Sequence, residues 1–340
     1  MTQPTQARQA SPELFFATIN AYQRTAAVKA ALELNVFTAI AEGQDTPAAL
    51  AARCGAAERG MRILCDYLVV IGFLTKEGGR YGLTDDSVVF LNRNSSAYIG
   101  GTVKFLLSPM LTEGFKDLAA AVRKGGTVIS EQGSLEPEHP IWVEFARSMA
   151  PMTTLPAQAI ARMVALDPAR NSKELDIAAG HGKFGIAFGM EYPKAEIVAL
   201  DWPNVLQVAV ENARGAGLES RYKTIPGSAF DAAFGSGYDV VLLTNFLHHF
   251  DRLTCESLLR KVHAALAGGG RAVTLEFVPN EDRVSPPVAA SFSLMMLGST
   301  PSGDAYTLRE YEEMFRNAGF ASSELHPLPP GFQSVVISYK

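Results

Sequence analysis

A chain of 340 residues, 47% of them hydrophobic and 19% charged, has enough apolar material for the cores of two domains. Its formal net charge of −5 gives no general attraction to nucleic acids or other phosphate polymers. No apolar run in the sequence is long enough to span a bilayer, and the polar start MTQPTQARQA lacks the apolar core of an export signal. The three cysteines, Cys54, Cys65 and Cys255, are widely spaced and suit free thiols in a reducing compartment. We therefore expect a cytoplasmic protein without disulfides.

The N-terminal part begins with helical patterns. Apolar residues recur at helical spacing over residues 12–42, and Asn35 or Gly43 could end the pieces of this segment. Thr46 is a suitable N-cap for a short helix, because Pro47 follows it at the first helical position. The pattern predicts several successive helices before residue 55.

A longer helix and a hairpin follow. Residues 58–73 form a strongly apolar helical segment. Residues 74–84 read as two short strands around Gly78 and Gly79, a pair typical of hairpin turns. This order of elements predicts a winged helix-turn-helix, and we assign it to a first domain over residues 1–100.

A winged helix often binds DNA, but the charge of this one does not favour DNA binding. Residues 1–95 carry nine Lys and Arg against nine Asp and Glu. The helix that would enter the groove is largely apolar and contains only two arginines. Phosphate neutralisation supplies most nonspecific affinity for DNA, so a transcriptional regulator is the weaker alternative. An apolar helical surface favours contact with another protein chain.

The pattern changes along the second half of the chain. Residues 96–170 are mainly helical, with a Gly- and Pro-containing break at 124–140. From residue 173 onward, strands alternate with helices. We predict strands over 174–179, 196–202, 238–249, 270–278 and 332–340, and helices over 141–166, 204–217, 253–269 and 307–320. Continuous apolar strands separated by helices predict an α/β fold with a parallel sheet covered on both faces, here over residues 156–340.

The stretch ELDIAAGHGKFG contains the pattern G-x-G-x-x-G at Gly180, Gly182 and Gly185. Glycines let the backbone approach a ligand closely, and the N-terminus of the following helix offers free N–H groups. Asp201 ends the next predicted strand, where its carboxylate can accept hydrogen bonds from ribose hydroxyls. These features are shared by NAD sites and S-adenosylmethionine sites.

Asp176 distinguishes the two cofactors. It lies inside the first strand, just before the glycine loop. A carboxylate at this point would repel a pyrophosphate, which argues against a dehydrogenase, but it suits the ammonium group of an amino-acid cofactor, directly or through water. The segments LAGGGRAVTLE and FQSVVISYK are typical of the fifth and the final antiparallel strand of class I methyltransferases. The sequence therefore predicts S-adenosylmethionine as the cofactor.

Taken together, these pieces resemble the hydroxyindole and caffeate type of small-molecule O-methyltransferase, from residue 12 to residue 340. The resemblance is carried by VKAALELNVF, DIAAGHG, ALDWPNV, TNFLHHFDRLTC, GGGRAVTLEFV and YTLREYEEMFRNAGF. It implies an N-terminal dimerisation domain, linking helices over 101–155 and a Rossmann-like catalytic domain. It also implies a homodimer in which the first helix, around Asn20 and Tyr22, reaches the partner's pocket. The implied reaction is methylation of a hydroxyl on a small phenolic or polyketide-like aromatic molecule.

Two adjacent histidines follow the fourth strand, and ligands of doubly wound sheets bind beyond the carboxyl ends of the strands. By the resemblance, His248 in FLHHF matches the family's general base and Glu276 its orienting acceptor. A neutral histidine, with an ordinary pKa of about 6.5, can take the proton of a phenol. His249 stands where many plant relatives have Asp, and we expect it to contact the substrate. Two histidines without a clear third ligand do not predict a metal site.

Three positions depart from the family pattern. Ser228 replaces the usual Asp in the adenine loop PGSAF, Thr244 stands where plant relatives have Lys, and Ala305 replaces a second acidic residue beside the base. The predicted cofactor-binding residues are Asp176, Gly180, Gly182, Asp201, Trp202, Ser228, Ala229, Phe230 and Thr244.

Methionine and aromatic side chains recur on the linking helices and over 286–298. They predict an adaptable apolar pocket for a planar aromatic substrate. The predicted lining residues are Phe145, Met149, Met152, Phe292, Met295 and Met296, beside His249. A C- or N-methyltransferase on the same scaffold is the alternative within enzymes, since His248 could serve as a base there too. A regulator that only senses S-adenosylmethionine would need the first domain to bind DNA.

Overall fold

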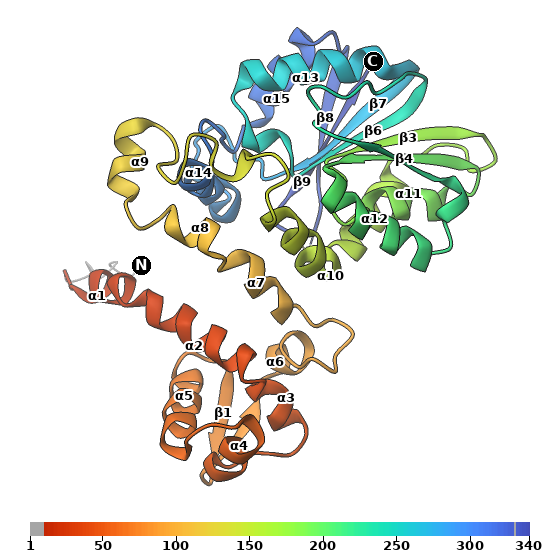
Figure 1. The fold of residues 1–340 in the computed structure, drawn as a ribbon. Helices are drawn as coiled ribbons and strands as arrows, with labels where there is room; N and C mark the ends of the chain where they lie inside the picture. The colour runs from red at the N-terminus through yellow and green to blue at the C-terminus, as the bar shows by residue number, and fades with distance from the viewer. Residues whose placement is uncertain (1–9, 330) are drawn as a thin grey trace, which may run out of the picture. The chain divides into compact units, whose positions relative to one another are not determined.

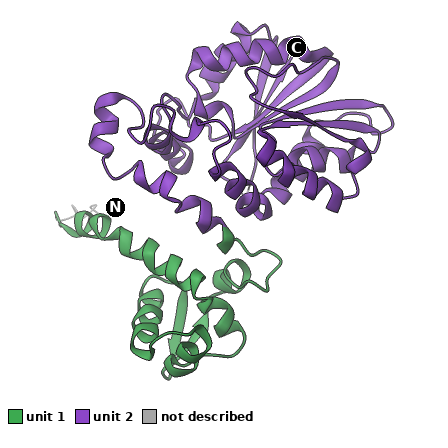
Figure 2. Cartoon of the chain, in the orientation of Figure 1, with its two compact units in different colours: residues 1–101 green, residues 102–340 purple. Residues whose placement is uncertain are grey.

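The computed structural model describes residues 10–329 and 331–340, which fall into two compact units over residues 1–101 and 102–340 (Figures 1 and 2). The polar N-terminal start lies almost wholly outside the described residues. The predicted linking helices belong to the second unit, and the predicted boundary after residue 155 falls inside a helix, Ile141–Met163. No described helix combines the length and the apolar character needed to cross a membrane.

The first unit consists of helices followed by a two-stranded hairpin, as predicted, and one further helix. Its elements are α1 (Glu13–Ile19), α2 (Ala21–Glu33), α3 (Val36–Ala41), α4 (Pro47–Cys54), α5 (Glu58–Val70), β1 (Leu74–Glu77), β2 (Arg80–Leu83) and α6 (Asp85–Phe90).

Local signals explain where these elements start and stop. Asn35 has a φ of 59° and separates α2 from α3, and the Thr46 hydroxyl accepts the Ala49 N–H (3.3 Å) at the start of α4. Gly78 and Gly79, both with positive φ, form the hairpin turn between β1 and β2. The predicted helix 58–73 is three residues too long, because α5 ends before a turn at Gly72, which has a φ of 86°.

The first helix, α1, buries none of its own residues. Leu14, Phe15, Phe16 and Ile19 are between 57 and 75% exposed, and Tyr22 at the start of α2 is also exposed. Such a run of large apolar side chains on one short segment is unusual for a surface in contact with water and is typical of surfaces that contact another protein chain.

The second unit is built on a seven-stranded sheet with the order β5-β4-β3-β6-β7-β9-β8. Strand β9 runs antiparallel to β7 and β8, and the other neighbouring strands are parallel, which confirms the α/β prediction. The strands are β3 (Ser172–Ile177), β4 (Ala195–Asp201), β5 (Tyr222–Pro226), β6 (Tyr238–Thr244), β7 (Leu266–Glu276), β8 (Ser322–Pro327) and β9 (Ser334–Tyr339). The α-helices are α7 (Val103–Leu106), α8 (Pro109–Glu113), α9 (Leu118–Lys124), α10 (Ile141–Met163), α11 (Lys183–Glu191), α12 (Pro203–Gly215), α13 (Arg252–Ala265), α14 (Pro287–Ser299) and α15 (Leu308–Asn317).

Helices cover both faces of this sheet (Figure 1). On one face, α13 and α15 pack on a core that includes Leu175 and Ile177 of β3. On the other face, α10, α11 and α12 pack on a core that includes Ile197 and Ala199 of β4. Because side chains alternate along a strand, Glu174 and Asp176 of β3 point toward this second layer of helices.

Two further predicted boundaries are wrong, and one strand was not predicted. The strand predicted over 238–249 ends at Thr244, because Asn245 has a φ of 55° and turns the chain, so His248 and His249 lie in a 3₁₀ turn beyond the sheet. The helix predicted over 253–269 ends at Ala265, and the following glycines already belong to β7. The edge strand β8 was not predicted, because its sequence SSELHP is polar and only partly buried.

Candidate active site

The glycine loop connects β3 to α11 with backbone conformations that only glycine adopts readily. Gly180 and Gly182 have φ values of 57° and 70°. A Cβ on Gly182 would lie 2.5 Å from the hydroxyl oxygen of Tyr222 and 3.0 Å from Cβ of Ala209, so no side chain fits there. The backbone of the loop therefore lies next to the N-terminus of α11, where the helix has free N–H groups.

Asp201, at the end of β4, ties this loop to the neighbouring strand. Its carboxylate accepts the N–H of Gly180 (2.8 Å) and the N–H of Trp202 (2.7 Å). Desolvation raises the pKa of Asp201 to about 6, against the two backbone donors, which lower it. The residue is partly exposed, so its carboxylate can also receive hydroxyl donors from a ligand.

Asp176 lies below the loop and faces the helix that follows it. One carboxylate oxygen accepts the N–H of Gly185 (3.2 Å), and the other oxygen has no partner. Burial raises the pKa of Asp176 to about 7, and the nearby Asp201 adds to the shift. Glu174 is also completely buried, neither of its carboxylate oxygens has a partner, and its pKa is well above the usual range because of burial and Asp176.

These features fit S-adenosylmethionine. Asp201 presents a carboxylate at the end of β4 beside this loop, and the side chains buried beneath the loop, Glu174 and Asp176, are acidic, which suits a cationic cofactor. Hydrogen bonds hold the loop 226–230, which the sequence predicted to contact adenine: Ser228 accepts the Phe230 N–H (3.1 Å), and Lys261 donates to the carbonyls of Ala229 (3.0 Å) and Phe230 (2.9 Å). Thr244 is buried at the end of β6.

His248 and Glu276 form a buried pair beyond the ends of β6 and β7. His248 Nδ1 is hydrogen-bonded to Oε2 of Glu276. The other carboxylate oxygen accepts the N–H groups of Phe246 (3.0 Å) and Leu247 (2.9 Å). Glu276 therefore fixes both the histidine ring and the turn that carries it. Ala305, where the family pattern has a second acid, is completely buried.

His249 is neutral and lies among rings. Its Nδ1 is buried without a partner, and its ring is 5.3 Å from Trp142 and 4.2 Å from His248, centroid to centroid. Burial, and then the neighbouring His248, hold the pKa of His249 well below the usual range. A neutral imidazole here offers one donor and one acceptor to a substrate.

Aromatic side chains continue from the two histidines in both directions. Phe292 of α14 lies 4.9 Å from His248 and stacks on Phe277 (4.1 Å). Phe145 of α10 stacks on His181 at 6.2 Å. The other predicted lining residues vary: Met149 and Met295 are half-buried, Met296 is buried and Met152 is 45% exposed.

Sequence reasoning missed Trp142, His181 and Phe277 as members of this aromatic group. His181 lies within the glycine loop, and Phe277 directly follows Glu276, so their positions beside predicted site residues were available signals. Trp142 had no such signal, because it reaches His249 from 107 residues away in the chain.

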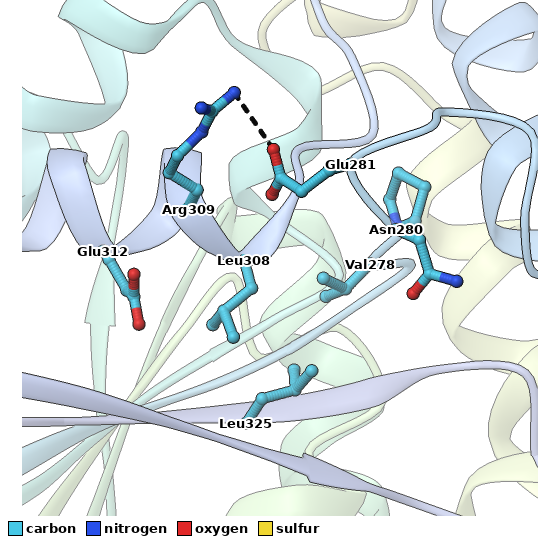
Figure 3. Close-up of a pocket in the computed structure, with 8 residues that line it drawn as sticks. Val278, Asn280, Glu281, Leu308, Arg309, Glu312 and Leu325 are labelled. Atoms are coloured by element: carbon cyan, nitrogen blue, oxygen red, sulfur yellow. Dashed lines mark ion pairs between the residues drawn. The ribbon is translucent and has the colours of Figure 1, made fainter.

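A surface hollow of about 490 Å³ lies apart from these residues, beyond the end of β7 and against α15 (Figure 3). Its rim carries the ion pair between Arg309 and Glu281 (3.0 Å). It shares no residue with the predicted site; the residues lining it are Val278, Pro279, Asn280, Glu281, Leu308, Arg309, Glu312 and Leu325.

The sheet order, the glycine loop after β3 and the carboxylate at the end of β4 together define a class I methyltransferase. Comparison with known families agrees: an O-methyltransferase domain model matches residues 115–321, and an O-methyltransferase dimerisation domain model matches residues 16–93. The chain belongs to this O-methyltransferase family and is an S-adenosylmethionine-dependent methyltransferase.

Individual relatives cover nearly the whole chain. A 3-hydroxy-5-methyl-1-naphthoate 3-O-methyltransferase of Streptomyces sahachiroi is 28% identical over 93% of this chain and 92% of that protein. An L-tyrosine C(3)-methyltransferase of Streptomyces lavendulae is 28% identical over 86% and 82%. A solved O-methyltransferase structure from Nostoc punctiforme is 58% identical, with a TM-score of 0.95 over 98% of this chain and 100% of that chain. A neocarzinostatin-pathway O-methyltransferase solved with S-adenosylmethionine and 2-hydroxy-5-methyl naphthoic acid is 25% identical, with a TM-score of 0.70 over 93% and 95%.

The buried acids below the loop predict an unusual pH dependence of stability. Asp176 and Glu174 bind protons more tightly in the folded chain than in the unfolded chain, so the free energy of unfolding falls as the pH rises. For Asp176, the free energy of unfolding falls between about pH 3.8, the ordinary pKa, and about pH 7, the pKa in the folded chain. The fall is at most about 1.4 kcal/mol per pH unit for this one proton. Calorimetric melting of the cofactor-free protein at pH 5.5, 7 and 8.5 should show a falling Tm, with a shallower fall in Glu174→Gln. A Tm that rises with pH would contradict the assignment of these protons.

Proposed function

We propose that this enzyme methylates a hydroxyl group on a small aromatic molecule, with His248 as the general base. The observation that carries the proposal is the buried pair of His248 and Glu276, held at the carboxyl ends of β6 and β7 and surrounded by aromatic rings. Relatives that act on a hydroxynaphthoate support an aromatic acceptor. We assign Phe145, His249 and Phe292 to substrate contacts on the same grounds.

The chemistry asked of the chain is the removal of one proton. S-adenosylmethionine supplies an electrophilic methyl group on a sulfonium. Because the Glu276 carboxylate only accepts hydrogen bonds, His248 Nδ1 carries the proton in their bond, which leaves Nε2 free to accept the hydroxyl proton of the substrate. A phenol has a pKa near 10, and its oxygen becomes nucleophilic as the proton moves to the ring. Buried Glu276 then stabilises the imidazolium that forms.

C-methylation of an aromatic ring is the second candidate, and it rests on the L-tyrosine C(3)-methyltransferase among the relatives. The same base could remove a proton from the ring or from its hydroxyl in that reaction. The two functions are separated by incubating the enzyme with catechols, hydroxyindoles, flavonoids and naphthols and locating the new methyl by NMR. Products with O-methyl groups support the proposal, and products with only C-methyl groups overturn it.

We also propose that the enzyme is a homodimer through its N-terminal domain. The match to the dimerisation domain and the exposed apolar side chains of α1 support it. Light scattering should give twice the chain mass of 36.5 kDa at micromolar concentration. A chain that lacks residues 1–95 should be monomeric or aggregated, because the partner surface is lost. A monomeric full-length protein would refute the proposal.

A further inference from the structure

Four buried polar atoms below the glycine loop have no hydrogen-bond partner. They are both carboxylate oxygens of Glu174, one oxygen of Asp176 and the hydroxyl of Tyr222. Glu174 and Asp176 are completely buried, and Tyr222 is 9% exposed. Buried polar groups are nearly always paired, so four such atoms in one place require an explanation.

The side chains that carry these atoms lie around two glycines, Gly182 and Gly185. A Cβ on Gly185 would lie 3.3 Å from both the Asp176 Oδ2 and the Glu174 Oε2 atoms. Three residues earlier, a Cβ on Gly182 would lie 2.5 Å from the Tyr222 hydroxyl. The missing side chains of these glycines leave the two acids directly beneath the loop that receives the cofactor.

Among the described residues, no lysine, arginine or histidine contributes to the pKa shifts of Glu174, Asp176 and Tyr222. In β4 and β6, the residues in register with Glu174 and Asp176 are the apolar Ile197, Ala199, Val240 and Leu242. From β5 comes the Tyr222 phenol, and from the end of β4 the acidic Asp201, both near enough to interact electrostatically. Helix α11 contributes the N–H of Gly185, and its Lys183 acts on His181 instead.

We propose that Glu174 and Asp176 determine the preference of the enzyme for S-adenosylmethionine over its product S-adenosylhomocysteine. Without a counter-ion, burial raises the pKa of Asp176 to about 7 and that of Glu174 well above its usual range, so the pair holds a proton at neutral pH in the cofactor-free protein. The substrate cofactor carries a sulfonium charge that the product lacks. Its positive charge stabilises the ionised acids, so that binding drives a proton from the pair to solvent, whereas the product does so less. This inference rests on the cofactor of the family and is independent of the methyl acceptor.

Calorimetry of cofactor binding tests the proposal directly on the wild-type enzyme. Binding heats measured in buffers of different ionisation enthalpy give the number of protons released. We expect more protons released with S-adenosylmethionine than with S-adenosylhomocysteine at pH 7. The ratio of the Kd of the product to the Kd of the substrate cofactor should rise by about fivefold from pH 6 to pH 8. Equal proton release for the two ligands would overturn the proposal.

The variant Glu174→Gln tests whether Glu174 itself causes the pH dependence of the Kd ratio. The amide has nearly the same shape but cannot ionise, so the pH dependence of the Kd ratio should shrink clearly. The matched control is Glu196→Gln on the adjacent strand β4, where the carboxylate is 37% exposed and paired with Lys223 (2.5 Å). That change should leave the ratio and its pH dependence as in wild type. A Glu174→Gln enzyme with the wild-type pH dependence would remove Glu174 from the proposal, even if the enzyme O-methylates its substrates normally.

Discussion

His248→Ala is expected to lower turnover by about 10²–10⁴-fold, the usual contribution of a positioned general base. Affinity for S-adenosylhomocysteine should stay within a few-fold of wild type, because the glycine loop and Asp201 are unaltered. The loss should be smaller for more acidic phenols and at high pH, where the hydroxyl ionises without help. Steady-state rates for a series of phenols between pH 6 and 9.5 measure this.

Two further variants separate the base from its surroundings. His263→Ala changes a histidine on α13 that packs against Phe320 away from the site, so it should keep full activity. Glu276→Gln should lower turnover by up to the same factor, because an amide whose oxygen accepts the N–H groups of Phe246 and Leu247 turns its NH2 toward His248 Nδ1 and favours the tautomer with the proton on Nε2. If His248→Ala loses the same factor at every pH, the ring positions the substrate and is not the base.

The geometry of the glycine loop and of Asp201 was predictable because its signals are local. Gly180 and Gly182 carry their requirement for positive φ in their own identity, and Asp201 ends a continuous apolar strand. The same logic predicted the α/β sheet with its closing antiparallel strand β9. The pattern and spacing of residues are sufficient to predict structure wherever residues close in sequence determine the geometry.

The surroundings of the two histidines and of Glu174 depend on contacts between residues far apart in the sequence, and no periodicity of the sequence predicts such contacts. Trp142 meets His249 only because α10 packs on the same face of the sheet as α11 and α12. The turn that carries His248 is fixed by Glu276, 28 residues later, and by the positive φ of Asn245. Glu174 reads as an ordinary polar residue at the start of a strand, and only the packing of α11 over β3 shows that its carboxylate is buried without a partner.

Asp201→Ala is expected to weaken the binding of S-adenosylmethionine and S-adenosylhomocysteine by about 1.5–3 kcal/mol, or roughly ten- to a hundredfold in Kd. Two losses combine in this variant. The ribose hydroxyls lose a charge-assisted acceptor, and the Gly180 N–H loses the carboxylate that holds the loop against β4. Because the product keeps the ribose, both ligands should be affected by a similar factor, unlike in Glu174→Gln.

Asp201→Asn serves as the matched variant in this experiment, since its amide oxygen can still accept the Gly180 N–H while the charge is gone. We expect a Kd between those of wild type and Asp201→Ala. Titration calorimetry with S-adenosylhomocysteine measures all three, and a melting curve of each variant without ligand verifies that the fold is intact. Unchanged binding in a folded Asp201→Ala protein would show that the ribose is held elsewhere, and the assignment of the strand-end carboxylate to the cofactor would then be wrong.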